Sequence, residues 1–392
     1  MAFCEKENGV DLVDIPTAGL RPRSGADCGS CSRCLAVCPG VSVDAAETND
    51  DEPESIVENL QVGNYHGVYE GYAADREIRF IGSSGGILSA LSVYALEKGG
   101  MDYVVHTGMD KAQPWKNRTV ISRNKPQLLD NAGSRYCTSS PCELFDVIEK
   151  SAGRCVFIGK PCDVAALAKA RRLRPQLDAN VGLALSFFCA GTPCSDAVRE
   201  LVGGLGVEAD EISSLRFRGQ GWPGRFEVQS TKGGEPKTIS YLRTWTTLAK
   251  RRPFRCHICP DGMGLLSDIT SGDAWNRYTG EAESDGISHV VVRTGRGRRL
   301  LESAVQAGYV ELTPSTADDI IKAQGIHLRR TVVFGRLIGM RLCGVPTPRY
   351  SNFGLFSSWL RTNPLVMTSS IFGTLKRMVV RKLWRRSPYF YR

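Results

Sequence analysis

Four cysteines near the amino terminus follow one another at short, fixed intervals and constrain this chain more than any other feature. Cys28, Cys31, Cys34 and Cys38 are followed by Pro39, which gives the pattern C-x2-C-x2-C-x3-C-P. This spacing is typical of a [4Fe–4S] cluster site. Closely spaced thiolates can surround one face of a cubane while backbone N–H groups between them point at its sulfides. The run therefore predicts a small iron–sulfur module.

The sequence does not decide which residue is the fourth ligand of that cluster. In two-cluster ferredoxins the fourth cysteine of such a run binds the other cluster, and this sequence has no second complete run. Either Cys38 closes the cluster itself, or a remote thiol such as Cys4 does so. A structural zinc site is the alternative, because zinc also takes pairs of cysteines at this spacing.

Cysteine is abundant in the whole chain, with 14 in 392 residues. The first twenty residues carry acidic groups and no continuous apolar core, so we expect no signal or transit peptide and a cytoplasmic protein. Cytosolic thiols stay reduced, which disfavours disulfides and favours ligation of a metal or redox cofactor. No stretch reaches 18 apolar residues, which argues against a transmembrane helix.

The positive charge of the chain is confined to its carboxy-terminal part. The formal net charge is +9, yet 14 of the 50 Lys and Arg residues and none of the 41 acidic ones lie after position 319. The preceding residues are therefore net acidic, and we expect no specific nucleic acid partner. The basic tail over 346–392 is either a solvated extension or a segment that contacts the inner face of a membrane or an acidic partner protein.

Helix and strand patterns alternate after residue 65 and predict an α/β body with mixed α+β character. An alternating stretch over 212–230 adds a β-hairpin insertion, in which Arg216, Arg218 and Arg225 form one basic edge. The expected helices lie over 87–98, 163–172 and 298–307, and the other expected strands over 103–105, 155–159, 181–188, 288–294 and 309–312. We divide the chain into an iron–sulfur module with its linker, a first and a second part of the body, and a tail, over 1–64, 65–150, 151–345 and 346–392.

A segment of small residues, Gly-Ser-Ser-Gly-Gly over 82–86, precedes the first expected helix. Small residues at a helix amino terminus let backbone N–H groups approach an anion, so a phosphate of a nucleotide or flavin is one candidate ligand. A plain loop is the other interpretation, because the strand-G-x-G-x-x-G-helix pattern of dinucleotide sites is absent.

Four further cysteines fall where open α/β sheets collect ligands. Cys162 and Cys189 follow two expected strands, at the carboxyl edge of the sheet, and Cys256 and Cys259 form a C-x2-C pair. Four thiols suffice for a second cubane or a tetrahedral zinc, and burial as small core residues is the alternative for the first two. We expect the remaining cysteines of the body to be core residues, namely Cys137, Cys142, Cys155, Cys194 and Cys343.

A series of ordered motifs runs from about residue 75 to residue 345. They are Ser84-Gly85-Gly86, Gly133-Ser134-Arg135-Tyr136, Gly159-Lys160-Pro161-Cys162, Phe188-Cys189-Ala190-Gly191, and the segments 217–224, 256–261 and 267–273. Together they resemble the coenzyme F420 hydrogenase/dehydrogenase beta-subunit family, in both its amino- and carboxy-terminal parts. The resemblance implies a [4Fe–4S] cluster on Cys162, Cys189, Cys256 and Cys259. It also implies an FAD site at Ser84, Gly85, Gly86, Gly133, Ser134, Tyr136, Asp268, Ser271, Gly272 and Asp273.

The preceding cysteine run is similar in plan to the two-cluster pigment reductases of this family, so the implied cofactors are two [4Fe–4S] clusters and FAD. Those enzymes have a longer spacer where Cys38 here follows Cys34 closely, so a pigment substrate is not carried over. Lys160 stands where related sequences often have a small residue. We expect it to act catalytically, by stabilising an anionic reduced flavin.

We predict an iron–sulfur flavoprotein oxidoreductase that takes electrons from coenzyme F420 or reduced ferredoxin and reduces an organic substrate. The alternative is an electron-transfer beta subunit that has no substrate of its own and serves a partner enzyme. A third interpretation is a zinc-stabilised binding protein whose basic tail contacts RNA or a membrane.

Overall fold

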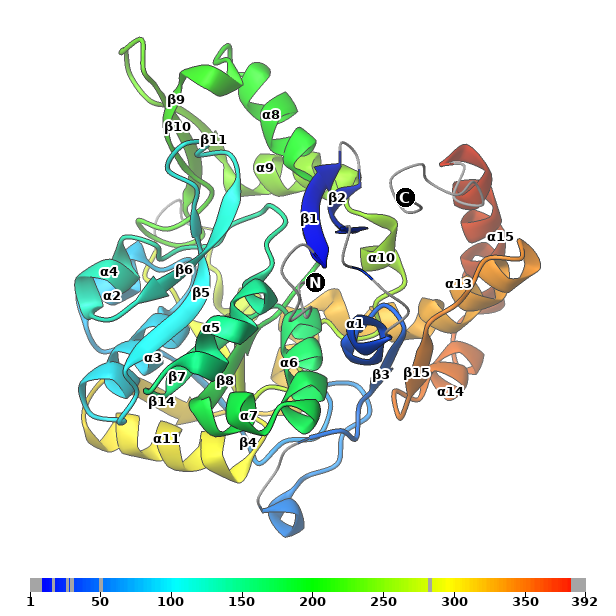
Figure 1. The fold of residues 1–392 in the computed structure, drawn as a ribbon, viewed down its shortest axis with the longest axis horizontal. Helices are drawn as coiled ribbons and strands as arrows, with labels where there is room; N and C mark the ends of the chain where they lie inside the picture. The colour runs from blue at the N-terminus through cyan, green and yellow to red at the C-terminus, as the bar shows by residue number, and fades with distance from the viewer. Residues whose placement is uncertain are drawn as a thin grey trace.

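The computed structural model describes residues 9–15, 18–25, 28, 32–48, 52–280 and 284–381 (Figure 1). An eight-stranded mixed sheet lies at its centre. The spatial order of its strands is β14 (Val310–Pro314), β4 (Gly67–Ala73), β13 (Ser288–Val292), β12 (Ile269–Asp273), β8 (Val181–Phe187), β7 (Cys155–Gly159), β5 (Tyr103–Met109) and β6 (Asn117–Ser122). The four strands β12, β8, β7 and β5 are parallel, so their carboxyl ends meet at one edge, where such sheets bind ligands.

Helices cover both faces of the sheet, because its inner strands carry apolar side chains on both sides. On β7, Val156 packs in one cluster with Leu91 and Leu301, whereas its neighbour Phe157 packs in another with Leu167. Successive side chains of a strand point to opposite faces, so the sheet lies between two helical layers. The first layer holds α3 (Ile87–Glu97) and α11 (Gly295–Gln306), and the second α5 (Phe145–Lys150), α6 (Pro161–Leu173) and α7 (Pro175–Asn180). The predicted α/β fold is confirmed.

Short elements connect these layers. Two further helices are α2 (Arg76–Ile81) and α4 (Lys125–Leu129). Single turns of 3-10 helix occur at Pro53–Ser55, Pro141–Leu144, Ala209–Glu211, Ala249–Arg251, Trp275–Arg277 and Gly325–Arg329.

The predicted hairpin insertion forms a separate small layer beside the carboxyl edge of the sheet. It contains β9 (Ile212–Arg216), β10 (Arg225–Ser230), β11 (Lys237–Ser240), α8 (Ser195–Gly203) and α9 (Tyr241–Leu248), with α8 and α9 visible above the main sheet in Figure 1. Phe217, Phe226 and Leu248 lie in its own apolar core. The hairpin is confirmed, but its predicted basic edge is wrong at Arg218, which is buried and points inward.

The amino-terminal segment lies against both the body and the carboxy-terminal helices. It forms an antiparallel hairpin of β1 (Val10–Ile15) and β2 (Gly19–Ser24), then α1 (Arg33–Val37) and β3 (Ser42–Asp44). β3 pairs in parallel with β15 (Arg349–Ser351), which joins two segments from opposite ends of the chain. Val37 of α1 is fully buried in the same apolar cluster as Phe157.

The carboxy-terminal part is helical. It consists of α12 (Ala317–Ala323), α13 (Arg330–Leu342), α14 (Leu355–Leu360) and α15 (Pro364–Val380), and α13 to α15 form a group at the right of Figure 1. Met378 of α15 and Val333 of α13 are buried in one apolar cluster, so most of the described tail is packed helix. Within the described residues, no helix combines the length and the apolar character needed to cross a membrane.

Candidate functional site

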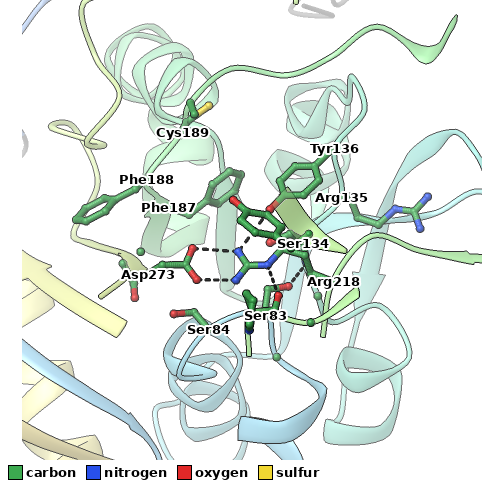
Figure 2. Close-up of a pocket in the computed structure, with 18 of the residues that line it drawn as sticks. Ser83, Ser84, Ser134, Arg135, Tyr136, Phe187, Phe188, Cys189, Arg218 and Asp273 are labelled. Carbon is green, nitrogen blue, oxygen red and sulfur yellow. Dashed lines mark hydrogen bonds and ion pairs between the residues drawn. The ribbon is translucent and has the colours of Figure 1, made fainter. Parts of the chain in front are cut away.

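A cavity of about 1040 Å³ opens at the carboxyl edge of the sheet. Its walls come from the amino end of α3, the ends of β7, β8 and β12, and the hairpin layer with α9. This volume is at the upper end of the range for small-molecule and cofactor sites. Figure 2 looks into it and shows Ser83 and Ser84 below, Ser134, Arg218 and Asp273 in the middle, and Cys189 above.

Most of the residues predicted to contact a flavin line this cavity. They are Ser84, Gly86, Gly133, Ser134, Tyr136, Ser271, Gly272 and Asp273. Two do not line it. Gly85 packs against the backbone of Gly71, and its N–H donates to Ser288 Oγ at 2.8 Å. Asp268 is buried directly before β12, at the amino end of that strand. Its carboxylate there accepts hydrogen bonds from Ala184 N and Thr294 Oγ1 at 2.7 Å and pairs with Arg296.

The glycine-rich segment adopts the geometry that its sequence requires. Gly86 precedes α3 with a φ of +75°, and Gly133, across the cavity floor, has a φ of +97°, a region that favours glycine. Ser134 N donates a hydrogen bond to Ser83 Oγ, which ties the two segments together (Figure 2). The first turn of α3, from Gly86 to Ser89, therefore lines the cavity, and the unpaired N–H groups of a helix start suit an anionic group.

Arg218 and Asp273 form a buried ion pair in the cavity wall. Two guanidinium nitrogens of Arg218 donate to the carboxylate at 2.7 and 3.0 Å (Figure 2). Trp222 Nε1 also donates to it at 2.7 Å. Burial lowers the pKa of Arg218, but Asp273 outweighs this and raises it well above its usual value, so the side chain is a permanent cation. Sequence reasoning missed this inward role. The sequence feature that could have indicated this role is the motif over 217–224, because it contains both Arg218 and Trp222, the two residues that donate to Asp273.

Aromatic rings surround that ion pair. Tyr241 stacks on Trp275 with ring centres 5.3 Å apart, and the Arg218 guanidinium lies 4.4 Å from the centre of the Tyr241 ring. On the other side Tyr136 contacts Trp245 at 5.2 Å. Of these residues, only Tyr136 was predicted from the sequence to belong to the site. Flat rings next to a fixed cation form a surface on which a planar, electron-rich molecule can stack.

The four cysteines implied as a second cluster site come together beside this cavity. Cys189 N donates to Gly262 O at 2.8 Å, which places the end of β8 against the loop that follows Cys259. Burial raises the pKa of Cys162 well above its usual value, and the nearby groups that raise it further include the thiols of Cys259 and Cys189. Burial likewise raises the pKa of Cys189 to about 11, with Cys256 contributing. These influences place Cys162 near Cys189 and Cys259, and Cys189 near Cys256 and Cys259.

Arginines surround these thiols. Arg255 lies in α10 (Phe254–His257), and its charge opposes the rise in the pKa of Cys259 that burial causes. Arg329 acts in the same way on Cys189 and Cys259. Neutral buried thiols need no such cations, whereas four thiolates around a metal cluster carry negative charge that cations stabilise. The site therefore fits a thiolate-ligated cluster.

The described residues contain no group of three or more His, Cys, Asp or Glu side chains spaced to hold a single metal ion. Zinc–sulfur bonds of about 2.3 Å draw four thiols close together. A cubane is larger than one ion and needs its four thiols further apart. Cysteine thiolates ligate both groups, so the chemistry of these four side chains fits either one.

Lys160 lies between the cavity and the thiols, at the amino end of α6. Its Nζ donates to Asp163 Oδ2 at 2.6 Å and to Ser139 O at 3.0 Å, and it lines the cavity. Burial lowers its pKa, but Asp163 outweighs this and raises it, so Lys160 is charged. Because the Asp163 carboxylate lies next to the Lys160 ammonium group, it offsets much of the positive potential that the lysine would otherwise produce in the cavity.

The amino-terminal cysteine run is partly described. Cys31 and Cys4 lie outside the described residues, so the complete run is not placed. Cys28 is exposed, Cys34 lies on α1 against the core, and Cys38 directly follows that helix, where its Sγ accepts a hydrogen bond from Gly40 N at 3.3 Å.

The predicted core cysteines are confirmed. Cys137, Cys142, Cys155 and Cys194 are buried, and Cys343 packs half-buried against the second core.

Comparison with known proteins identifies the body of the chain. Residues 68–145 match the amino-terminal part of the beta subunit in the family described as coenzyme F420 hydrogenase/dehydrogenase, and residues 152–318 match its carboxy-terminal part. The chain is 26% identical over 271 residues to coenzyme F420 hydrogenase subunit beta of Methanosarcina barkeri, covering 66% of this chain and 85% of that one. It is 22% identical over 344 residues to the coenzyme F420-dependent sulfite reductase of Methanocaldococcus jannaschii, covering 77% of this chain and 49% of that one.

A solved structure shares the fold. A chain of the F420-reducing [NiFe] hydrogenase complex from Methanosarcina barkeri superposes with a TM-score of 0.54 at 22% identity, covering 85% of this chain and 99% of that one. The two family matches account for most of the main sheet and of the cavity wall. The chain belongs to the coenzyme F420 hydrogenase/dehydrogenase beta-subunit family, an oxidoreductase family.

Proposed function

We propose that this protein is an iron–sulfur flavoprotein that transfers electrons between coenzyme F420 and an acceptor, with FAD in the large cavity. The names of its relatives support coenzyme F420 as the two-electron carrier. One structural observation carries the proposal. Cys189 both lines the cavity and belongs to the group of four thiols, so a flavin and a cluster bound there would be neighbours.

When bound, a flavin exchanges a hydride with a two-electron carrier and single electrons with an iron–sulfur cluster. The residues of this chain bind and orient it. The start of α3 would bind a phosphate of the flavin through its backbone N–H groups, and Gly86 and Gly133, which line the cavity, would leave room for it. Arg218, held by Asp273, presents a fixed cation toward the centre of the cavity. Cys162, Cys189, Cys256 and Cys259 hold the cluster in this proposal.

A second cluster on Cys28, Cys31, Cys34 and Cys38 completes the proposed cofactor set. Among the described members of this run, Cys34 lies on the short helix α1 and Cys38 directly follows it, and this helix packs on the body near α6. In this proposal reduced ferredoxin would exchange electrons with this exposed end of the protein, and the pair of clusters would connect it to the cavity.

Two candidates remain for the electron acceptor. Beta subunits among the relatives support a partner enzyme that receives the electrons. The aromatic wall of Tyr241, Trp245 and Trp275 favours the second candidate, an organic substrate that this chain reduces itself, because it extends the cavity beyond the strand ends. In the first case the purified protein oxidises reduced F420 only with artificial acceptors. In the second it also reduces a molecule of its own.

The test is anaerobic purification of the full chain, followed by measurement of its iron, sulfide, zinc and flavin. We expect one flavin and about eight irons per chain, with about four irons lost in each of the variants Cys28→Ala and Cys256→Ala. Cys343→Ala is the matched control and should retain all of them. Zinc in place of iron, or an absence of flavin, would refute the proposal. An assay of reduced F420 oxidation, with a viologen dye as the electron acceptor, then tests whether F420 is the two-electron carrier.

A further inference from the structure

Helix α15 packs on α13 through its small and polar side chains. Ser370 and Thr374 of α15 are buried and face Gly335 and Gly339 of α13. A Cβ atom at Gly335 would collide with Ser370, and one at Gly339 would lie 3.1 Å from Thr374 Cβ. The two helices thus approach closely at a G-x-x-x-G pair, the packing mode in which small residues let helix backbones come together.

The opposite face of α15 carries large apolar side chains in the open. Leu365, Phe372, Val379 and Val380 are 77%, 66%, 59% and 70% exposed. At 100° per residue these positions fall on one side of the helix, together with the exposed Lys376. A helix on a water-facing surface normally buries its large apolar residues and exposes its polar ones. In α15 this order is partly reversed: Met378 is buried, but Ser370 and Thr374 are buried as well and the large apolar side chains named above are exposed, as in helix pairs whose outer surface meets lipid.

The charges around this face are of one sign. Residues 320–381 contain ten Lys and Arg residues and no Asp or Glu, and those from 382 to the end add four more. Lys376 is exposed on the outer side of α15 and Arg361 is exposed just before the helix, whereas Arg381 at its end donates a hydrogen bond to Arg252 O of the body. Exposed Phe356 and Leu360 of α14 continue the apolar character of this end of the molecule. A basic, apolar surface complements the headgroups and outer acyl region of an anionic bilayer.

We propose that the outer face of α15 binds anionic membrane surfaces, with the helix lying flat in the interface. The helix has 17 residues and is about 25 Å long, and an interfacial orientation buries its apolar side chains while its basic groups contact phosphate headgroups. The inference is independent of the proposed electron transfer. It would place the redox site beside the membrane, where lipid-soluble or membrane-bound carriers are available.

Vesicle flotation of the full chain tests this proposal. We expect the protein to float with vesicles of phosphatidylcholine and phosphatidylglycerol, and at least about tenfold less with phosphatidylcholine alone or at high salt. The variant L365S/F372S/V379S should lose binding at least about tenfold, because it removes the apolar contacts. The matched control is Phe80→Ser, which removes an aromatic ring that is 56% exposed on α2, and it should bind like the wild type.

The vesicle experiment and a test for self-association distinguish a lipid surface from a second copy of the chain as the partner of this face. A wild-type protein that binds no anionic vesicle overturns the proposal, and so does a triple variant that binds as well as the wild type. A second copy of the chain is tested by sedimentation velocity without lipid. A dimer that the triple variant dissociates would assign the face to self-association and overturn the lipid assignment. Circular dichroism of each variant verifies that it is folded.

Discussion

The side chain of Arg255 donates a hydrogen bond to the carbonyl oxygen of Pro39 at 2.5 Å, although the two residues are 216 positions apart. Pro39 follows Cys38 directly and Arg255 precedes Cys256 directly, so this contact joins the two cysteine groups. A Cβ atom at Gly40 would lie 3.2 Å from Cys38 Sγ and 3.6 Å from Arg255 Nε, so both atoms lie against the same glycine. One cation thus lies between both proposed cluster sites.

Arg255→Gln should lower the midpoint potentials of both clusters. Burial lowers the pKa of Arg255, but Tyr350 and the thiols of the second group outweigh this and raise it, so the residue is charged. A reduced cluster carries one more negative charge than an oxidised one, and a neighbouring cation favours the reduced state. Redox titration followed by electron paramagnetic resonance measures both potentials. Arg255→Lys, which keeps the charge, should stay close to the wild type.

Unchanged potentials in Arg255→Gln, with both clusters present, would show that Arg255 has only a structural role. The same spectra report magnetic coupling between the reduced clusters. We expect this coupling in the wild type, because the hydrogen bond to Pro39 holds the two cysteine groups next to each other.

Asp273→Ala should destabilise the protein and release its flavin. The substitution leaves the buried Arg218 cation without its partner, which typically costs about 3–5 kcal/mol. The double variant Arg218→Met/Asp273→Ala removes both charges and should recover most of the free energy of unfolding but not the flavin. Chemical denaturation and flavin content measure the two effects separately. A single variant as stable as the wild type would contradict this assignment.

Gly272→Ala should weaken flavin binding by at least about tenfold. A Cβ atom at Gly272 would overlap the ring of Phe188, and both residues line the cavity. Overpacking of this kind costs about 1–3 kcal/mol and would shift the cavity wall. Gly203→Ala is the control, since no atom lies within 4 Å of its Cβ position at the end of α8. Equal flavin affinity in the two variants would show that the flavin does not bind against the cavity wall formed by Gly272 and Phe188.

Lys160→Met should lower the midpoint potential of the bound flavin. The substitution leaves Asp163 as an unpaired carboxylate near the cavity, and its negative charge disfavours an anionic reduced flavin. The double variant Lys160→Met/Asp163→Asn has no charge there and should return toward the wild-type potential. Spectroelectrochemistry measures each value. If the single variant kept the wild-type potential, Lys160 would have no role in tuning the flavin.

His106 should make stability depend on pH between about 6.5 and 4. Burial lowers its pKa to about 4, and its Nε2 lies 2.8 Å from Ser122 Oγ. The unfolded chain binds a proton below about pH 6.5 that the folded chain does not, so stability falls as the pH decreases through this range. His106→Gln should reduce that loss by up to about 3 kcal/mol. Denaturation curves at pH 7 and 4.5 test this, and equal losses in both proteins would argue against it.

The sequence predicted those parts of the site that depend on local pattern. The strand over 155–159 is β7 as observed, and the rule that ligands gather at carboxyl strand ends correctly placed Cys162 and Cys189 at one edge. These predictions succeeded because strand periodicity and strand direction are encoded in short stretches of the chain.

The parts that the sequence did not predict depend on distant contacts. Whether Arg218 faces solvent or the cavity is decided by Asp273 of β12, 55 positions away, and by the ring of Tyr241 in α9. The direction of Asp268 likewise depends on Thr294 and Arg296 of another segment. No short pattern carries this information, because packing between separate elements selects the face of each side chain.

Among the described strands, β4 pairs only with β13 and β14, whose residues follow it by more than 200 positions. At synthesis rates of about 5–20 residues per second, the ribosome needs roughly 10–50 s to produce those partners after β4 has been made. During this interval a strand that buries Val68 and Ala73 in the folded protein has no hydrogen-bonding neighbour. The central sheet is therefore completed late in translation, and nascent chains that stall before residue 288 should be targets for chaperones.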